Sequence, residues 1–313
     1  MTKRGLFSKK NLTVLAVLLL AAALPFIAPY EGLASEILIF ALFAMAFDLV
    51  LGYAGMLSFG HAAFFGIGAY GAGILLIRVY PSVLLALLGS VLVSSVAAFL
   101  IGFASIRRRG IYFTMVTLAF AQMFYFIAFK WTALTGGDDG LQGVPRPSVG
   151  PLDLGPEINL YYFILFVVVI STAIMVRVVN SPFGSTLQAL RENRNRTMSI
   201  GYDVDRFKLM AFVISGFFSG LAGGLYALLQ NFVPLSSLYW TTSGEVVVMT
   251  IAGGMGTLFG PALGAFGIIL LRDVISNYTE SWSFFMGVLF MVAVLGFRGG
   301  IIGVLRDRLK VQV

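Results

Sequence analysis

Long stretches without charged residues alternate with short polar segments along the chain. A helix that crosses a hydrocarbon core of about 30 Å needs about 20 residues, at a rise of about 1.5 Å each. The charge-free windows are 11–30, 37–47, 49–77, 79–106, 110–129, 158–176, 209–244, 246–271 and 281–297. This pattern predicts an all-α integral membrane protein that crosses the bilayer many times.

Two of these windows contain breaks that change the number of spans. Pro234 interrupts the window 209–244, so we expect one helix from about Phe207 to Asn231 followed by a short outer loop. Glycines and a proline between Gly253 and Pro261 interrupt the window 246–271. This break predicts two short segments, 246–259 and 262–279, and brings the expected total to about ten spans.

The distribution of basic residues favours ten spans. Cytoplasmic loops of membrane proteins collect Lys and Arg. With ten spans and a cytoplasmic N-terminus, most of the 21 Lys and Arg residues lie on the cytoplasmic side, and Arg78, Lys130, Arg146 and Arg272 lie on or near the outer side. An unbroken window 246–271 would place the basic C-terminal tail outside. We therefore expect both termini in the cytoplasm and, because the window 11–30 is longer than a usual signal-peptide core, a retained first helix.

Composition narrows the class of protein further. The chain of 313 residues is 59% hydrophobic and only 11% charged, with a mean hydropathy of +0.94, whereas soluble domains carry about 25% charged residues. This excludes a water-soluble protein, and the absence of cysteine excludes disulfides and thiolate metal sites. We expect one transmembrane domain over 1–313, with an outer loop at 131–157 and no soluble domain.

The motifs of several enzyme and transporter classes are missing. No lysine follows a glycine, so there is no P-loop, and neither a Gly-x-Ser-x-Gly elbow nor an HExxH site is present. We therefore expect a chain that is not an enzyme and that binds no cofactor or metal. The charged residues inside or beside spans, Asp48, Glu245, Arg272 and Asp273, lie nearer predicted helix ends than centres, which favours anchoring or local pairing over ion coupling.

A cytoplasmic segment after the sixth span has the signals of a short helix. Ser181 suits the N-cap, Pro182 suits the first helical position, and Gly201 suits the left-handed residue that follows a helix. Such a helix either lies on the membrane surface or docks on a cytoplasmic partner that supplies energy. The candidate coupling residues are Leu187, Leu190, Arg191, Glu192, Asn193, Arg194 and Gly201.

Two glycine-broken stretches, 55–62 and 254–262, resemble one another. Interrupted segments in corresponding places of two halves point to a transport pathway, because unwound backbone needs a cavity or a ligand. Tight turns between helices would give the same composition, His61 is also consistent with polar packing, and Gln122 with a bond between helices. The candidate pathway residues are Gly55, Ser58, Gly60, His61, Gln122, Gly254, Gly256 and Gly260.

Several blocks in order resemble a known family. They are RRGIYFTMVTLAF at 108–120, LTGGDDGL at 134–141, REN at 191–193 with GYDV at 201–204, and GGMGTLFGP at 253–261. Over about 42–298 the chain resembles the second permease subunit of bacterial branched-chain amino acid ABC importers.

The resemblance implies a multi-pass permease in the bacterial inner membrane. It implies four partners: a homologous second permease, two cytoplasmic ATPase subunits that hydrolyse the ATP, and a periplasmic substrate-binding protein. The helix 182–200 would be the coupling helix between spans six and seven, and transport would proceed by alternating access; no nucleic acid is expected as a partner. Two alternatives stay open, namely a relative that carries urea, short amides or aromatic acids, and a secondary carrier that works alone.

Overall fold

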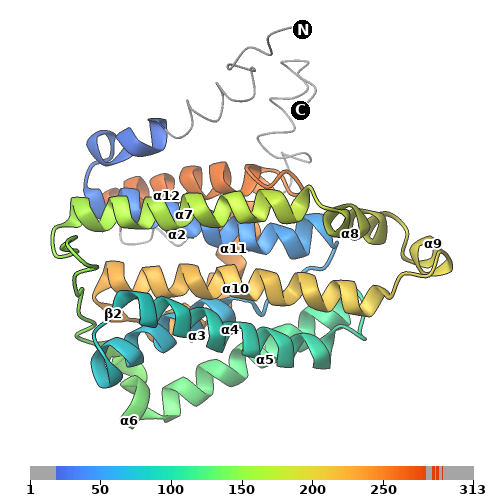
Figure 1. Cartoon of the computed structure of the whole chain (residues 1–313), viewed down its shortest axis with the longest axis horizontal. Coiled ribbons are helices and arrows are strands. Elements are labelled where there is room, and N and C mark those ends of the chain that lie inside the picture. The colour runs from blue at the N-terminus through green and yellow to red at the C-terminus, as the bar shows by residue number, and fades with distance from the viewer. Residues whose placement is uncertain (1–18, 280–283, 286, 289–290, 292–313) are drawn as a thin grey trace, which may run out of the picture.

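Long helices that lie side by side along one axis make up the molecule (Figure 1). The computed structural model describes residues 19–279, 284–285, 287–288 and 291. The long helices are α2 (Glu31–Asp48), α3 (His61–Ile74), α4 (Val83–Ser105), α5 (Ile111–Lys130), α7 (Glu157–Val179), α10 (Val204–Gln230), α11 (Trp240–Gly253) and α12 (Gly260–Tyr278). The short elements are α6 (Thr132–Thr135), α8 (Pro182–Glu192), α9 (Arg194–Ser199), the π-helical turns η1 (Leu49–Tyr53) and η2 (Leu75–Val79), the 3-10 turns η3 (Gly137–Asp139) and η4 (Leu235–Leu238), and strands β1 (Leu141–Gln142) and β2 (Phe232–Val233).

Six helical segments in the described part of the chain are long and apolar enough to cross a membrane. They are Glu31–Tyr53, His61–Val79, Val83–Ser105, Ile111–Lys130, Glu157–Val179 and Val204–Gln230. These spans confirm a predominantly helical, multi-pass membrane protein. The total of ten spans and the sidedness of the termini stay predictions, since the window 281–297 and most of the window 11–30 lie outside the described residues.

Three boundaries expected from the sequence are wrong, and one of them is that of α11, which covers Trp240–Gly253 and not 246–259. Asp48 does not separate two spans: the helix of α2 continues through it into η1, and the break falls at residues 54–60. The buried carboxyl group is tolerated inside the helix because it accepts hydrogen bonds from two backbone N–H groups. The helix expected over 182–200 is also divided at Asn193, whose extended backbone ends α8 and whose side chain caps α9 by accepting from the Arg196 N–H at 3.0 Å.

Close approach of backbones holds the centre of the bundle together. α10 packs against α2, α3 and α4, and α2 is almost completely enclosed. A Cβ on Gly220 would overlap Ser94 of α4, and one on Gly223 would overlap the Phe65 carbonyl of α3. Ser94 Oγ also donates to the Gly216 carbonyl at 2.7 Å. Glycine at these α10 positions therefore allows the close packing that substitutes for a hydrophobic driving force inside a bilayer.

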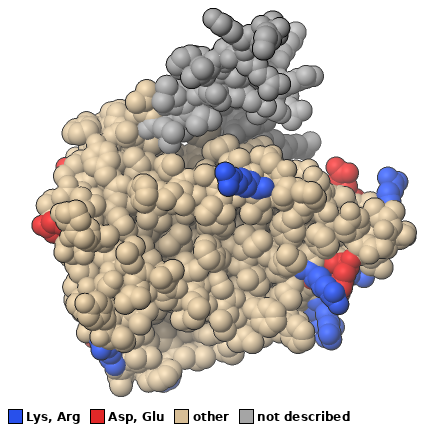
Figure 2. Space-filling model, viewed as in Figure 1, with Lys and Arg blue, Asp and Glu red and all other residues tan. Residues whose placement is uncertain are grey.

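The outward faces of α4, α5 and α7 are apolar, as surfaces that face lipid or another membrane helix must be. Leu88, Tyr112 and Phe166 are each more than 60% exposed. On the face shown in Figure 2, a broad uncharged band lies between two ends that hold most of the charged side chains. The end that carries α8 and α9 corresponds to the side expected to be cytoplasmic.

The predicted outer loop 131–157 folds over the opposite end of the bundle. It contains α6, η3 and β1, and β1 pairs antiparallel with β2, which follows α10. Arg146 donates to the carbonyls of Leu228 and Leu229 at 2.8 and 2.5 Å, and so satisfies groups at the C-terminal end of α10. Partial burial lowers the pKa of Arg146 below its ordinary value, and the nearby Glu157 opposes this shift.

Candidate functional site

The first glycine break lies between η1 and α3. The α2 helix widens into the π-helical turn η1, and the chain then leaves the helix at Gly55, which has a φ of +67°. Single π-helical turns inside longer helices are frequent at functional sites. A Cβ on Gly55 would be strained by this φ and would lie 3.0 Å from Cγ of Arg191. The break therefore passes directly beside α8, where Arg191 lies.

The second glycine break joins α11 to α12 and is bonded to α2. Gly254, Gly256 and Leu258 all have positive φ, at +119°, +81° and +45°. The Gly256 N–H donates to Oδ1 of Asp48 at 2.8 Å, and the Leu258 N–H donates to Oδ2 at 3.3 Å. Asp48 is fully buried. Its carboxylate thus supplies the partners that the unwound backbone of the second break would lack in a membrane.

Arg191 connects α8 to both breaks. Its Nη1 donates to the carbonyl oxygen of Gly52 in η1. The same Nη1 lies 3.0 Å from the position that a Cβ on Gly256 would occupy. We call the group Asp48, Gly52, Gly55, Gly256 and Arg191 the glycine junction. It brings together segments that lie far apart in the sequence, since Arg191 and Gly52 are separated by 139 positions.

Side chains of α8 fix this helix to the bundle. Leu187 is fully buried and Leu190 is 3% exposed, so both contribute to the core of this chain. Arg191, Glu192 and Asn193 are exposed, whereas Arg194 is half-buried and pairs with Asp205 at 3.0 Å. Gly201 ends α9 with a φ of +94°, as its predicted left-handed conformation requires. A displacement of α8 would therefore move the residues that contact it.

Ser58, Gly60 and His61 lie at the far end of the first break, where α3 begins. Ser58 is buried and accepts from the Gly60 N–H at 3.1 Å. His61 is fully buried, contacts the rings of Phe47, Phe64 and Phe212, and its Nε2 lies 2.9 Å from Oγ of Ser215. Because Ser215 gives its proton to the Ala46 carbonyl at 2.5 Å, Nε2 of His61 is the donor in this pair. This environment makes His61 part of the packing between α2, α3 and α10.

The remaining candidate pathway residues divide into two groups. Gly254 and Gly260 belong to the second break, and a Cβ on Gly260 would overlap Oγ1 of Thr257. Gln122 lies on α5, the helix whose Thr114 and Thr117 bond to the first break, and its Nε2 is buried and has no hydrogen-bond partner among the described residues. A buried amide nitrogen without a partner destabilises the folded chain. The Nε2 group of Gln122 can therefore still donate hydrogen bonds to a ligand.

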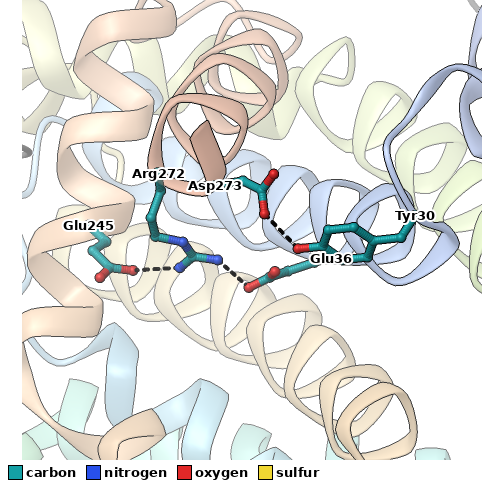
Figure 3. A network of polar contacts seen from close by, with 5 residues as sticks. All are labelled: Tyr30, Glu36, Glu245, Arg272 and Asp273. Atoms are coloured by element: carbon teal, nitrogen blue, oxygen red, sulfur yellow. Dashed lines mark hydrogen bonds and ion pairs between the residues drawn. The ribbon is translucent and has the colours of Figure 1, made fainter. Parts of the chain in front are cut away.

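A second polar cluster joins α2, α11 and α12 near the opposite end of the bundle (Figure 3). Arg272 pairs with Glu36 at 2.5 Å and lies 3.9 Å from Glu245. Tyr30 donates to Asp273 at 2.7 Å. Burial, followed by this hydrogen bond, raises the pKa of Tyr30 to about 12. The local pairing predicted for Glu245, Arg272 and Asp273 is confirmed.

Gly52 was missed by the sequence reasoning, although it is central to the glycine junction. A Cβ on Gly52 would overlap Oδ1 of Asp48 and the amide nitrogen of Gly256. The signal was a glycine four positions after an aspartate inside an apolar helix, but only the partner segment shows why it is there. Among the described residues, no group of three or more His, Cys, Asp or Glu is arranged to hold a metal.

Comparison with known proteins decides the class of this chain. Residues 30–294 match the family model described as branched-chain amino acid transport system / permease component. The chain belongs to this permease family. No solved structure matches it significantly.

Named relatives agree with this assignment. The permease is 29% identical to the high-affinity branched-chain amino acid transport system permease protein LivM of Salmonella typhimurium. The alignment of 329 residues covers 97% of this chain and 77% of the relative. The LivM protein of Escherichia coli gives the same identity and coverage. The autoinducer 2 import system permease protein LsrC of Enterobacter sp. is 29% identical over 170 residues, or 51% of this chain and 48% of the relative. The predicted family and the location in the bacterial inner membrane are thereby confirmed.

Proposed function

We propose that this permease is driven by two cytoplasmic ATPase subunits through α8, and that it carries branched-chain or similar small amino acids inward by alternating access. The observation that carries the proposal is the position of Arg191, which donates to Gly52 of η1, directly before the first break, and lies against Gly256 of the second break. One side chain on an exposed surface helix thus contacts both places where the spanning helices are interrupted.

The geometry supports a lever made of α8. Its buried face, with Leu187 and Leu190, moves with the bundle, while its exposed residues are free to meet a partner. A push on α8 would displace Arg191, and through it the η1 turn and the loop between α11 and α12. Bistable packing of this kind converts a small displacement at one site into a change between two states of the bundle.

Discontinuous helices are the usual place for a solute to pass. Both breaks leave backbone groups outside regular helices, and half-helix ends near such breaks bind substrates in other transporters. The cluster of Arg272 with Glu36 and Glu245 holds α2, α11 and α12 together at the opposite end. We assign it the role of the outer contact that must open when the path faces outward.

The substrate class and the partners rest on the family. The LivM proteins of Salmonella typhimurium and Escherichia coli align over 97% of this chain, whereas the LsrC protein of Enterobacter sp., named for autoinducer 2 import, aligns over 51% of it. We therefore propose branched-chain amino acids, a homologous second permease, two ATPase subunits and a periplasmic binding protein. The alternatives are urea, short amides or aromatic acids as substrates.

The test is a reconstituted complex with all partners, in which transport and ATP hydrolysis are measured together. Arg191→Glu should abolish stimulated transport while leaving basal ATP hydrolysis in the partner subunits, because the reversed charge cannot donate to Gly52. Arg196→Glu is the matched control, since Arg196 lies on α9 and its guanidinium forms no hydrogen bond to either break among the described residues. Normal coupling in Arg191→Glu would refute the lever.

A secondary carrier is the second candidate, and the same vesicles test it. Uptake by this polypeptide alone under an ion gradient, without ATPase subunits, would favour that candidate. The buried carboxylate of Asp48 is engaged by two backbone N–H groups, which is a structural role and does not require ion coupling. We therefore expect no gradient-driven uptake by the isolated chain.

A further inference from the structure

A basic cavity opens at the end of the bundle that carries α8 and α9. Its volume is about 600 Å³. Four cationic side chains line it: Arg108 and Arg109 from the turn between α4 and α5, Arg194 from α9, and Lys208 from α10. None of the described residues that line the cavity is acidic.

The positive charge around this cavity is poorly balanced within the chain. Asp205 pairs with Arg194, and no other carboxylate in the described part of the chain lies within ion-pair distance of the four cations. The charges of Arg194, Asp205 and Arg109 all act on Lys208, so one carboxylate lies among these three cations. In addition, Nε of Arg194 is buried and has no hydrogen-bond partner among the described residues. Such an arrangement has a strong electrostatic preference for a bound anion.

The rim of the cavity continues into an apolar surface. Ile111 and Met115 of α5 line the cavity and are 66% and 55% exposed, and the neighbouring Tyr112 is 73% exposed. These residues form the first turn of a spanning helix, at the depth where aromatic and basic side chains meet lipid headgroups. A ligand with a phosphate at one end and hydrocarbon at the other matches both halves of this surface.

We propose that the cavity binds the phosphodiester headgroup of an anionic membrane phospholipid, with its acyl chains along Ile111, Tyr112 and Met115. The cytoplasmic leaflet carries the anionic lipids that attract basic juxtamembrane segments, and basic pockets between membrane helices bind such headgroups. A free anion would use the four cations but would leave the apolar rim without a partner. Gly55 of the glycine junction and Arg194 line the cavity, so the site adjoins the coupling region proposed above, although Arg191 itself does not line it.

Binding of defined lipids to the purified full-length permease, in complex with its partner subunits, tests this site. Cardiolipin, phosphatidylglycerol and phosphatidylcholine would be titrated, and the bound lipids counted by native mass spectrometry. Arg109→Gln and Lys208→Gln should each weaken cardiolipin binding about fivefold, as expected for the loss of one basic contact near the membrane surface. Arg109→Lys and Lys208→Arg keep the charge and should keep the binding. Phosphatidylcholine should bind equally to all variants.

Arg107→Gln is the matched control, because Arg107 belongs to the same run of three arginines but lies over the Phe103 ring at 5.7 Å and does not line the cavity. If Arg107→Gln weakened cardiolipin binding as much as Arg109→Gln does, the effect would be a general attraction between basic residues and anionic lipid. That result would overturn the proposal. Two other results would also overturn it. One is displacement of cardiolipin by millimolar inorganic phosphate, which would indicate a site for a free anion. The other is release of a partner subunit by Lys208→Gln with unchanged lipid binding, which would indicate a site for an acidic segment of that partner.

Discussion

Replacing Gly52 with alanine tests the contact between the two glycine breaks. The added Cβ would overlap Oδ1 of Asp48 and the amide nitrogen of Gly256. One of these atoms belongs to the backbone and the other to a carboxylate held by two hydrogen bonds, so neither moves away easily. The second break must therefore shift, or Asp48 must give up its bond to Gly256.

The size of the effect follows from these two contacts. Overpacking in a well-packed core costs about 1–3 kcal/mol, and a lost hydrogen bond to a charged group costs about 1.5–3 kcal/mol. Alanine regains about 1 kcal/mol of helix propensity over glycine. If the second break shifts and Asp48 also loses its bond, we expect a net loss of about 1.5–5 kcal/mol in the free energy of unfolding. The transport rate should fall at least tenfold, because the junction no longer closes.

Thermal unfolding of the purified permease in detergent measures the stability, and uptake by reconstituted vesicles measures the transport. Gly267→Ala in α12 is the matched control, because a Cβ there meets no atom of another described segment within 4 Å. This variant should be neutral or stabilise by up to about 1 kcal/mol. If Gly52→Ala and Gly267→Ala unfold at the same temperature and transport equally well, the breaks are not in contact and the argument for the glycine junction fails.

Three further substitutions probe separate contacts. Asp48→Asn turns one acceptor into a donor facing a backbone N–H, and should lower the free energy of unfolding by about 1–3 kcal/mol; a thermal midpoint equal to that of wild type would contradict the assigned bonds. Arg146→Ala frees the Leu228 and Leu229 carbonyls at the end of α10 and should speed proteolysis of the outer loop 131–157, whereas an unchanged cleavage rate would mean that this contact is unimportant. Gln122→Leu removes a buried amide nitrogen without a partner and should leave stability equal or higher while slowing uptake; normal uptake would remove Gln122 from the proposed path.

Features set by local chemistry could be predicted from the sequence. The charge-free windows predicted the six apolar spans found in the described residues, apart from the boundary at Asp48, because backbone in lipid must form helices of a fixed length. Ser181 and Pro182 gave the first residue of α8, and Gly201 gave the end of α9, because these residues act on the backbone next to them. The break between α11 and α12 followed in the same way from its glycines.

The tertiary structure decided which of these local features meet. A charge count could not show that Asp48 lies inside a continuous helix, since its partners, Gly256 and Leu258, come 208 and 210 positions later. Nor could it show that Arg191 contacts Gly52, or that Asn193 divides the surface helix. Apolar runs and capping residues determine the helices one by one, because their energies depend on neighbours in the chain. The pairing of buried polar groups is determined only when the helices pack, because each group needs a partner in a medium that offers no water.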